Sequence, residues 1–222
     1  MALNLLMLGP PGAGKGTQAE RFARERGIPK ISTGDILREA VHDKTDIGLR
    51  AKAIMDRGEL VSDEVMIGIV GERLGRPDAL NGFVLDGFPR TVAQAAALDG
   101  IMADRDPLIV VDIVVPEAEL VRRLGTRSIC RLCGTGASVG STVGAACAKC
   151  GGRLVQRTDD NQAVVLERLK VYHRQSEPLV EYYRVRPTFR SIDGAQAPDR
   201  VAADLAAAIA AAGNGGAAGV QG

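Results

Sequence analysis

The chain begins with an apolar segment that leads directly into a glycine-rich turn. Residues 3–17 read LNLLMLGPPGAGKGT, where a run of strand length ends at Gly9 and Lys15 stands where a helix should begin. Glycines allow the backbone to turn successive N–H groups inward and form a nest for an anion. The positive end of the helix dipole and the charge of Lys15 point to the same place. The segment therefore predicts a phosphate-binding turn between the first strand and the first helix of an α/β fold.

The spacing from Gly9 to Lys15 fits the P-loop of nucleoside triphosphate-binding proteins. Gly16 fills the position usually held by Ser or Thr, and Thr17 follows one residue later. The alternative is a glycine-rich turn with a solvated lysine, but the apolar run before it and the helical pattern after it favour the P-loop. The predicted triphosphate-binding residues are Gly12, Ala13, Gly14, Lys15, Gly16 and Thr17.

Short apolar runs alternate with helical patterns along the chain. Runs such as LIVVDIVV are almost continuously apolar, which is typical of strands buried on both faces of a sheet. The alternation predicts a three-layer α/β fold with a five-stranded parallel sheet covered by helices on both faces. The predicted strands are 3–8, 28–32, 82–86, 108–115 and 188–193.

Two segments do not fit simple connections between strands. The first is helical and too long for a crossover, and the second is rich in Gly, Ser, Thr and Cys. We expect a helix to start near residues 158–160 and to be interrupted at Pro178 before it ends near Tyr183. The predicted organisation is a core (1–31, 62–126 and 161–212), a first insertion (32–61), a second insertion (127–160) and a flexible tail (213–222).

All four cysteines fall in the second insertion, as two Cys-x2-Cys pairs separated by thirteen residues. Gly134 and Gly151 follow the pairs and permit tight turns around the sulfur atoms. Such pairs predict a tetrahedral Zn²⁺ site whose four thiolates leave no open position, so the metal would be structural. Disulfides, a redox pair and iron on the same ligands are the alternatives, and reduced thiols in a cytoplasmic chain favour a metal. The predicted ligands are Cys130, Cys133, Cys147 and Cys150.

The overall charge and composition disfavour several classes of partner. The 222 residues have a formal net charge of +1, which does not favour nucleic acid or an acidic membrane. We find neither an apolar run of membrane-spanning length nor a secretory signal before the first strand. We therefore expect a cytoplasmic monomer whose partners are small molecules.

Phosphoryl transfer requires positive charge around the moving oxygens, a magnesium ion and exclusion of water. Asp86 ends a predicted buried strand, at the sheet edge where α/β proteins bind ligands, and is the expected partner of Mg²⁺. Arginine binds phosphate through two parallel hydrogen bonds. The candidate phosphate ligands are Arg38, Arg90, Arg123, Arg127, Arg157 and Arg168.

With these segments in view, the chain resembles the adenylate kinase family. Its diagnostic segments occur in order as GPPGAGKGTQA (9–19), ISTGDILR (31–38), GFVLDGFPRT (82–91) with Gln94, and TDDN followed by ERL and YH (158–173). The form GKGT, with Gly16, is the one used by that family. The resemblance implies a P-loop NTPase fold, reversible phosphoryl transfer from Mg·ATP to AMP giving two ADP, and the zinc-bearing lid of long-form bacterial members.

The resemblance also implies a role for each matching residue. Besides the P-loop, Arg123, Arg127 and, more loosely, Gln196 match positions that contact ATP. The first insertion matches the AMP-binding domain, and Phe88–Pro89 matches a cis peptide bond. The implied AMP-binding residues are Thr33, Arg38, Glu59, Leu60, Val61, Gly87, Phe88, Pro89, Arg90, Gln94, Arg157 and Arg168. The implied catalytic residues are Lys15, Asp86, Arg90, Arg127, Arg157 and Arg168.

Three other functions are alternatives for a sequence of this kind. A sister kinase could phosphorylate UMP or CMP, although Thr33 and Gln94 favour adenine because a hydroxyl and an amide can read its donor–acceptor edge. A nucleotide-binding module without turnover is disfavoured by the number of phosphate-binding arginines. A zinc-ribbon nucleic-acid binder is disfavoured by the neutral charge and by the lack of aromatic residues in the second insertion.

Overall fold

The computed structural model describes residues 2–137, 141–157 and 160–215. Within these residues, five strands form a parallel sheet in the order β2-β3-β1-β4-β7. This arrangement confirms the predicted parallel sheet, with each strand within two residues of its predicted bounds. The strands are β1 (Leu3–Leu8), β2 (Lys30–Ser32), β3 (Gly82–Asp86), β4 (Leu108–Val114) and β7 (Phe189–Asp193).

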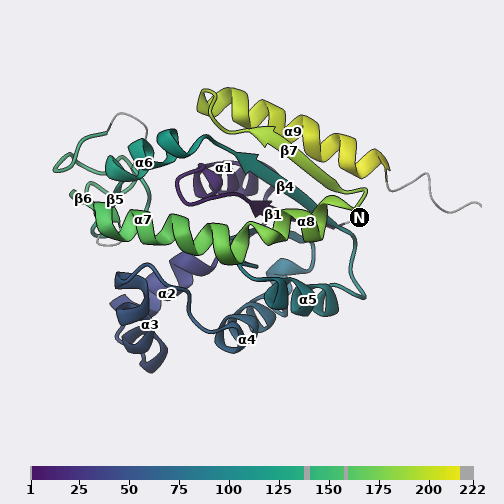
Figure 1. Ribbon diagram of the computed structural model, residues 1–222, viewed down its shortest axis with the longest axis horizontal. Helices are drawn as coiled ribbons and strands as arrows, with labels where there is room; N and C mark the ends of the chain where they lie inside the picture. Colours follow the sequence, from purple (N-terminus) through teal and green to yellow (C-terminus); the bar gives the residue numbers. More distant parts are fainter. Residues whose placement is uncertain (1, 138–140, 158–159, 216–222) are drawn as a thin grey trace, which may run out of the picture.

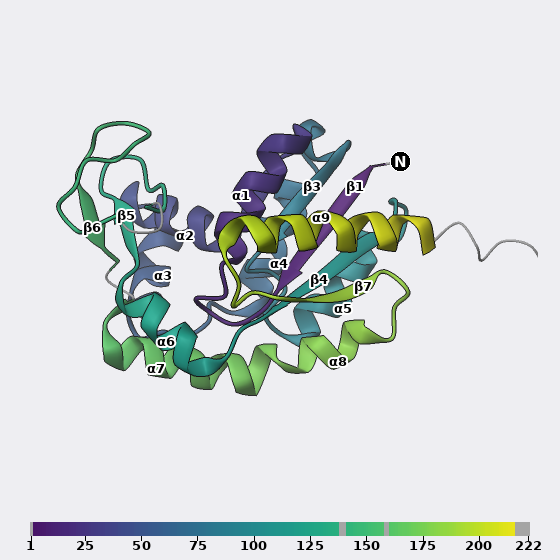
Figure 2. The same ribbon diagram turned by 90° about the horizontal axis from the view of Figure 1, so that it is seen from above.

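Helices cover both faces of the sheet (Figures 1 and 2). Alternate residues of β1 point to opposite faces, so Leu5 and Met7 pack with α1 and α9, whereas Leu6 and Leu8 pack with α4, α5 and α8. Burial on both faces explains why the strands read as continuous apolar runs. The helices of the core are α1 (Lys15–Arg26), α4 (Asp63–Leu74), α5 (Val92–Ile101), α6 (Glu117–Gly125), α7 (Gln162–Val171), α8 (Pro178–Arg184) and α9 (Pro198–Gly215), with a 3₁₀ turn η1 (Pro77–Ala79).

Two insertions extend from the same end of the molecule, on the left in both ribbon views (Figures 1 and 2). The first contains α2 (Thr33–His42) and α3 (Asp46–Asp56), which pack against each other. The second contains the antiparallel strands β5 (Ser128–Cys130) and β6 (Leu154–Gln156). These segments leave the sheet near the carboxyl ends of β2 and β4, so they flank the edge where ligands bind in parallel sheets.

The long helix after the second insertion differs in detail from the prediction. Its N-cap is Asn161, whose side chain accepts a hydrogen bond from Val164 N, and Thr158 and Asp159 lie outside the described residues. The interruption takes the form of a π-helical turn, η3 (Tyr172–Ser176), just before Pro178. A proline cannot donate to the preceding turn, which favours a break at this point.

The C-terminal helix extends past the predicted start of the tail. The sequence predicts that a flexible tail starts at residue 213, whereas α9 continues through residues 213–215 and ends at Gly215. Residues 216–222 lie outside the described residues. Among the described helices, none is long and apolar enough to cross a membrane.

Candidate active site

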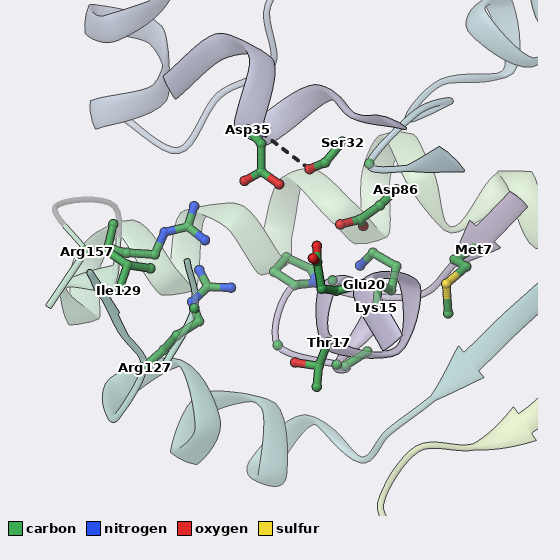
Figure 3. A pocket seen from close by; sticks show the side chains of 18 of the residues that line it. Met7, Lys15, Thr17, Glu20, Ser32, Asp35, Asp86, Arg127, Ile129 and Arg157 are labelled. Carbon is green, nitrogen blue, oxygen red and sulfur yellow. Dashed lines mark hydrogen bonds between the residues drawn. The ribbon is translucent and has the colours of Figure 1, made fainter. Parts of the chain in front are cut away.

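A single open cavity of about 2190 Å³ lies between the sheet edge and the two insertions. Figure 3 shows Lys15 and Asp86 side by side, Asp35 on the side of the first insertion, and Arg127 and Arg157 reaching in from the second. The cavity therefore brings together side chains from segments that lie far apart in the sequence. Such a crevice at the carboxyl ends of parallel strands is the usual ligand site of this architecture.

The P-loop wraps around the amino end of α1. Gly9 has a φ of 132°, and a Cβ there would lie 2.6 Å from Ile113 O, so only glycine fits this close approach. The Lys15 ammonium donates to Gly9 O (2.6 Å) and Pro10 O (2.9 Å). Desolvation in the cleft lowers the pKa of Lys15 to about 8, although the nearby Asp86 carboxylate favours the charged form. A lysine held at the mouth of an anion nest is positioned to bind phosphate.

A buried carboxylate gathers three of the predicted arginines. Arg127 donates to both oxygens of Asp160 (2.6 Å each), and Arg168 donates to Oδ1 (2.9 Å). Arg157 Nε lies 4.0 Å from Asp160 Oδ2. The Asp160 side chain is 0 % exposed, so its charge is fully screened from water by these partners. The three guanidiniums thus form one positive wall that faces the P-loop across the cavity.

Arg38 and Asp35 form an ion pair one turn apart on α2. The Asp35 carboxylate also lies 3.0 Å from Lys30 Nζ, and Asp35 N is capped by Ser32 Oγ (3.3 Å). Although burial opposes the shift, the charges of Arg38 and Lys30 lower the pKa of Asp35 to about 2. The pair orients Arg38 at the rim of the cavity.

The carbonyl of Gly87 links two predicted AMP ligands. It accepts hydrogen bonds from Thr33 Oγ1 (2.7 Å) and Arg90 Nε (2.8 Å). The Phe88–Pro89 peptide bond is cis, as predicted. The Phe88 side chain, however, packs into the core beneath the cavity and is 1 % exposed, so the aromatic ring is not available to a nucleotide.

The remaining predicted contacts lie at the edges of the cavity. Arg123 donates to Glu119 Oε1 (2.7 Å) on the same helix. The Gln196 amide donates to Asp204 (2.9 Å) and to Asp193 O (3.2 Å), which turns its side chain toward α9. Glu59 is exposed and pairs with Arg57 (2.7 Å), while Leu60 and Val61 line the cavity wall.

Within the described part of the chain, every predicted nucleotide-site residue except Phe88 lines this one cavity. The acidic partners of the arginines were not predicted as site residues. Asp35 stands three residues before Arg38 on a helix, a spacing that permits contact. Asp160 contacts Arg127 across the base of the second insertion, a pairing that no local pattern in the sequence indicates.

The four cysteines form a compact cluster in the second insertion. All four Sγ atoms lie within 4.8 Å of one another, with 3.4 Å between Cys130 and Cys150 and 3.8 Å between Cys133 and Cys147. Four sulfurs around Zn²⁺, with bonds of about 2.3 Å, would lie about 3.8 Å apart. The cluster therefore fits a tetrahedral metal.

The surroundings of the cluster lower the pKa of two thiols and raise that of a third. A hydrogen bond with Thr135 lowers the pKa of the Cys133 thiol to about 6, and the backbone N–H of Cys133 lowers the pKa of Cys130. Although the backbone N–H of Gly152 favours its thiolate, hydrogen bonds with Cys133 and Cys130 raise the pKa of Cys150 to about 12. The apolar core of the insertion contains just Cys130, Cys147 and Leu154 among its buried described residues. So small a core needs a further cross-link, which a metal on the four sulfurs would supply.

Comparison with known proteins agrees with this site. The sequence model described as adenylate kinase matches residues 7–188 of the chain. The chain is similar to the adenylate kinase of Archaeoglobus fulgidus, with 52 % identity over 200 residues covering 86 % of this chain and 91 % of that protein. It is also similar to the adenylate kinases of Desulforudis audaxviator, with 47 % identity covering 93 % of this chain and 99 % of that protein, and of Geobacter sp. strain M21, with 49 % identity covering 94 % and 100 %. A match over most of both chains, together with the P-loop cavity, shows that this chain belongs to the adenylate kinase family.

Proposed function

We propose that the chain transfers the γ-phosphoryl group of ATP reversibly to AMP, giving two ADP. One observation carries the proposal: a single cavity holds a P-loop and, facing it, a second set of phosphate-binding side chains. A protein that only senses one nucleotide does not need the second set. The membership of the chain in the adenylate kinase family disfavours a UMP or CMP kinase and a module without turnover.

Each side of the cavity binds one nucleotide. The P-loop with Lys15 holds the phosphates of ATP, while Arg38 and Arg90 hold the AMP phosphate. The AMP phosphate attacks the γ-phosphorus directly, so positioning and neutralisation of charge supply the catalysis. Arg127, Arg157 and Arg168 exchange contacts with Asp160 for contacts with the transferred group, whose charge they stabilise.

A magnesium ion fits beside the P-loop. The Asp86 carboxylate ends β3 next to Lys15, and its Oδ2 would lie 3.3 Å from a Cβ at Gly16, so an oxygen ligand is available at the start of α1. Mg²⁺ prefers such carboxylate oxygens together with substrate phosphates. The bound ion would neutralise charge on the ATP phosphates.

The two insertions serve as covers for the substrates. We assign residues 32–61 to the AMP-binding domain and 127–160 to a lid that carries a structural Zn²⁺ on Cys130, Cys133, Cys147 and Cys150. Closure of both would exclude water, which otherwise accepts the phosphoryl group. We place the protein in the cytoplasm as a monomer.

The acceptor specificity tests the proposal. Purified protein is supplied with Mg·ATP and with AMP, UMP, CMP or GMP, and nucleoside diphosphate formation is measured for each acceptor. We expect AMP to have the highest kcat/KM by at least tenfold. Preference for UMP or CMP would assign the chain to a sister activity, and no transfer to any acceptor would contradict the proposal.

A further inference from the structure

A carboxylate outside the predicted site contacts Gln94, one of the residues predicted to bind AMP and to favour adenine. Gln94 lies in the first turn of α5 and is 1 % exposed. Its Nε2 donates to Asp63 Oδ1 (2.7 Å), and its Oε1 accepts from Arg90 N (2.8 Å). Asp63 is the first residue of α4, where the chain returns from the first insertion to the core. The amide is therefore held from both sides by groups of different elements.

These two partners determine which way round the amide lies. A carboxylate only accepts hydrogen bonds and a backbone N–H only donates, so Nε2 must face Asp63 and Oε1 must face Arg90. The reverse orientation would place the amide oxygen against the carboxylate and the NH₂ group against the N–H. Two acceptors would then face each other at Asp63 and two donors at Arg90, and both pairs would repel. This repulsion disfavours the flipped amide.

The partners are themselves fixed. The Thr91 hydroxyl donates to Asp63 Oδ2 (2.9 Å) and accepts from Gln94 N (3.2 Å), which also caps α5. The Arg90 carbonyl accepts from Ser176 Oγ (2.8 Å), so the backbone of Arg90 is held at both its N–H and its carbonyl. Such a network, in which each group has one role, resists rotation of any single member.

The fixed amide retains one N–H and one lone pair for a ligand. The edge of adenine presents an amino N–H beside the N1 acceptor, which matches the free oxygen lone pair and the free N–H of Gln94. Hypoxanthine and guanine present a carbonyl oxygen beside an N1–H, which is the opposite pattern. A site whose polar groups are fixed in one orientation rejects the opposite pattern because its buried groups are left unpaired.

We infer that Asp63 is a positioning residue for base recognition, whose carboxylate fixes the Gln94 amide in the orientation that reads adenine. The inference rests on the proposed function, because Gln94 can read adenine only if AMP binds in this cavity. It extends the specificity site to the start of α4, beyond the residues that touch the nucleotide.

The test compares AMP with IMP as acceptors, because IMP reverses the donor–acceptor pattern without adding a 2-amino group. We expect Asp63→Ala to raise the KM for AMP and to lower the AMP-to-IMP ratio of kcat/KM by about tenfold or more. The KM for ATP should change less than twofold. Asp63→Asn should retain most of the selectivity, since its oxygen can still accept from Gln94 while its NH₂ group donates to the Thr91 hydroxyl.

A double-mutant cycle separates positioning from a general structural effect. If Asp63 acts through Gln94, Asp63→Ala should leave the AMP-to-IMP ratio unchanged in a Gln94→Ala background. The matched control is Glu64→Ala, which removes the neighbouring exposed acid of the same helical turn and should resemble the wild type. If Asp63→Ala does not fold, Asp63→Ser replaces it, because serine keeps a polar side chain in the first turn of α4 but is too short to reach Gln94.

An unchanged AMP-to-IMP ratio in Asp63→Ala, or an equal rise in the KM values for ATP and AMP, would overturn the inference. Equal damage in Asp63→Asn and Asp63→Ala would overturn it too, because charge rather than orientation would then be responsible. A wild-type protein that phosphorylates neither acceptor would instead contradict the proposed function.

Discussion

Asp160 shows how one residue sets the electrostatics of the site. Its fully buried carboxylate contacts Arg127 and Arg168 directly and lies near Arg157. Three guanidiniums packed together without an anion would repel one another, so the carboxylate keeps them assembled. The sequence identifies the arginines because their segments are diagnostic, but it does not identify this partner, which depends on tertiary packing.

We predict that Asp160→Asn lowers kcat and raises the KM for ATP by about tenfold or more, because the arginine wall disperses. The free energy of unfolding should fall by about 1–3 kcal/mol, since buried positive charge loses its partner. Steady-state kinetics and urea unfolding measure the two effects. Asp56→Asn, which removes the exposed partner of Lys52, is the control and should change neither. Unaltered kinetics in Asp160→Asn would exclude a role for the carboxylate in assembling the arginines.

Gly87 is a second position where a single added carbon atom would disturb the site. Its φ is 81°, and a Cβ would lie 3.0 Å from Thr33 Oγ1 and 3.1 Å from Arg90 Nη2. We predict that Gly87→Ala raises the KM for AMP by about tenfold or more, with a smaller effect on ATP, because Thr33 and Arg90, the two predicted AMP ligands, must both move. Gly100→Ala is the matched control, since nothing lies within 4 Å of its Cβ position in α5. An AMP affinity unchanged in Gly87→Ala would contradict the tight geometry described for this loop.

At the scale of elements, α2 is anchored at its start by a charged cluster. Asp35 has a pKa of about 2 in the folded protein, because Arg38 and Lys30 outweigh the effect of burial. Its ordinary value is 3.8. The ionised group therefore stabilises the fold fully above about pH 4, and this contribution is lost as the pH falls through about 2.

We predict that Asp35→Asn lowers the Tm at pH 5 and that its difference from the wild type disappears as the pH approaches 2. Thermal unfolding followed by circular dichroism between pH 2 and 5 measures this convergence. A difference in Tm that stays constant with pH would show that the carboxylate does not carry the effect.

The second insertion depends on its cysteine cluster more than on apolar packing. We predict about one Zn²⁺ per chain by elemental analysis, falling to near zero in Cys133→Ser, with a lower Tm and faster proteolysis within residues 127–160. Ser141→Ala, in the same insertion, should retain the metal and the wild-type Tm. Full metal loss without any change in proteolysis of the insertion would contradict a structural metal.

The strands and the cysteine cluster could be predicted because their signals are local. Apolar runs predicted the parallel sheet, and the spacing of the two Cys-x2-Cys pairs predicted the cysteine cluster that the structure shows. The burial of the Phe88 ring could not be predicted, because the sequence does not show that the ring turns into the core. The Asp63–Gln94 contact joins residues 31 positions apart and likewise depends on how α4 packs against α5.

At the scale of the whole molecule, the predicted nucleotide-site residues other than Phe88 gather around one cavity at one end of the sheet. The P-loop and the two insertions surround a cavity of about 2190 Å³, more than twice the upper end of the roughly 300–1,000 Å³ of ordinary small-ligand sites. This volume suits two nucleotides placed end to end, with the insertions still open. Direct transfer between the two nucleotides is the central claim that follows from this arrangement.

The measurement that tests this claim most directly is a ³¹P NMR time course with Mg·ATP and AMP, repeated with Mg·ADP alone. We predict that ADP forms at twice the rate of AMP loss without inorganic phosphate, and that ADP alone yields equal amounts of ATP and AMP. Both reactions should reach the same equilibrium mixture. Release of inorganic phosphate with one ADP per ATP and no loss of AMP, or no conversion of ADP alone, would show that the facing phosphate sites do not exchange a phosphoryl group.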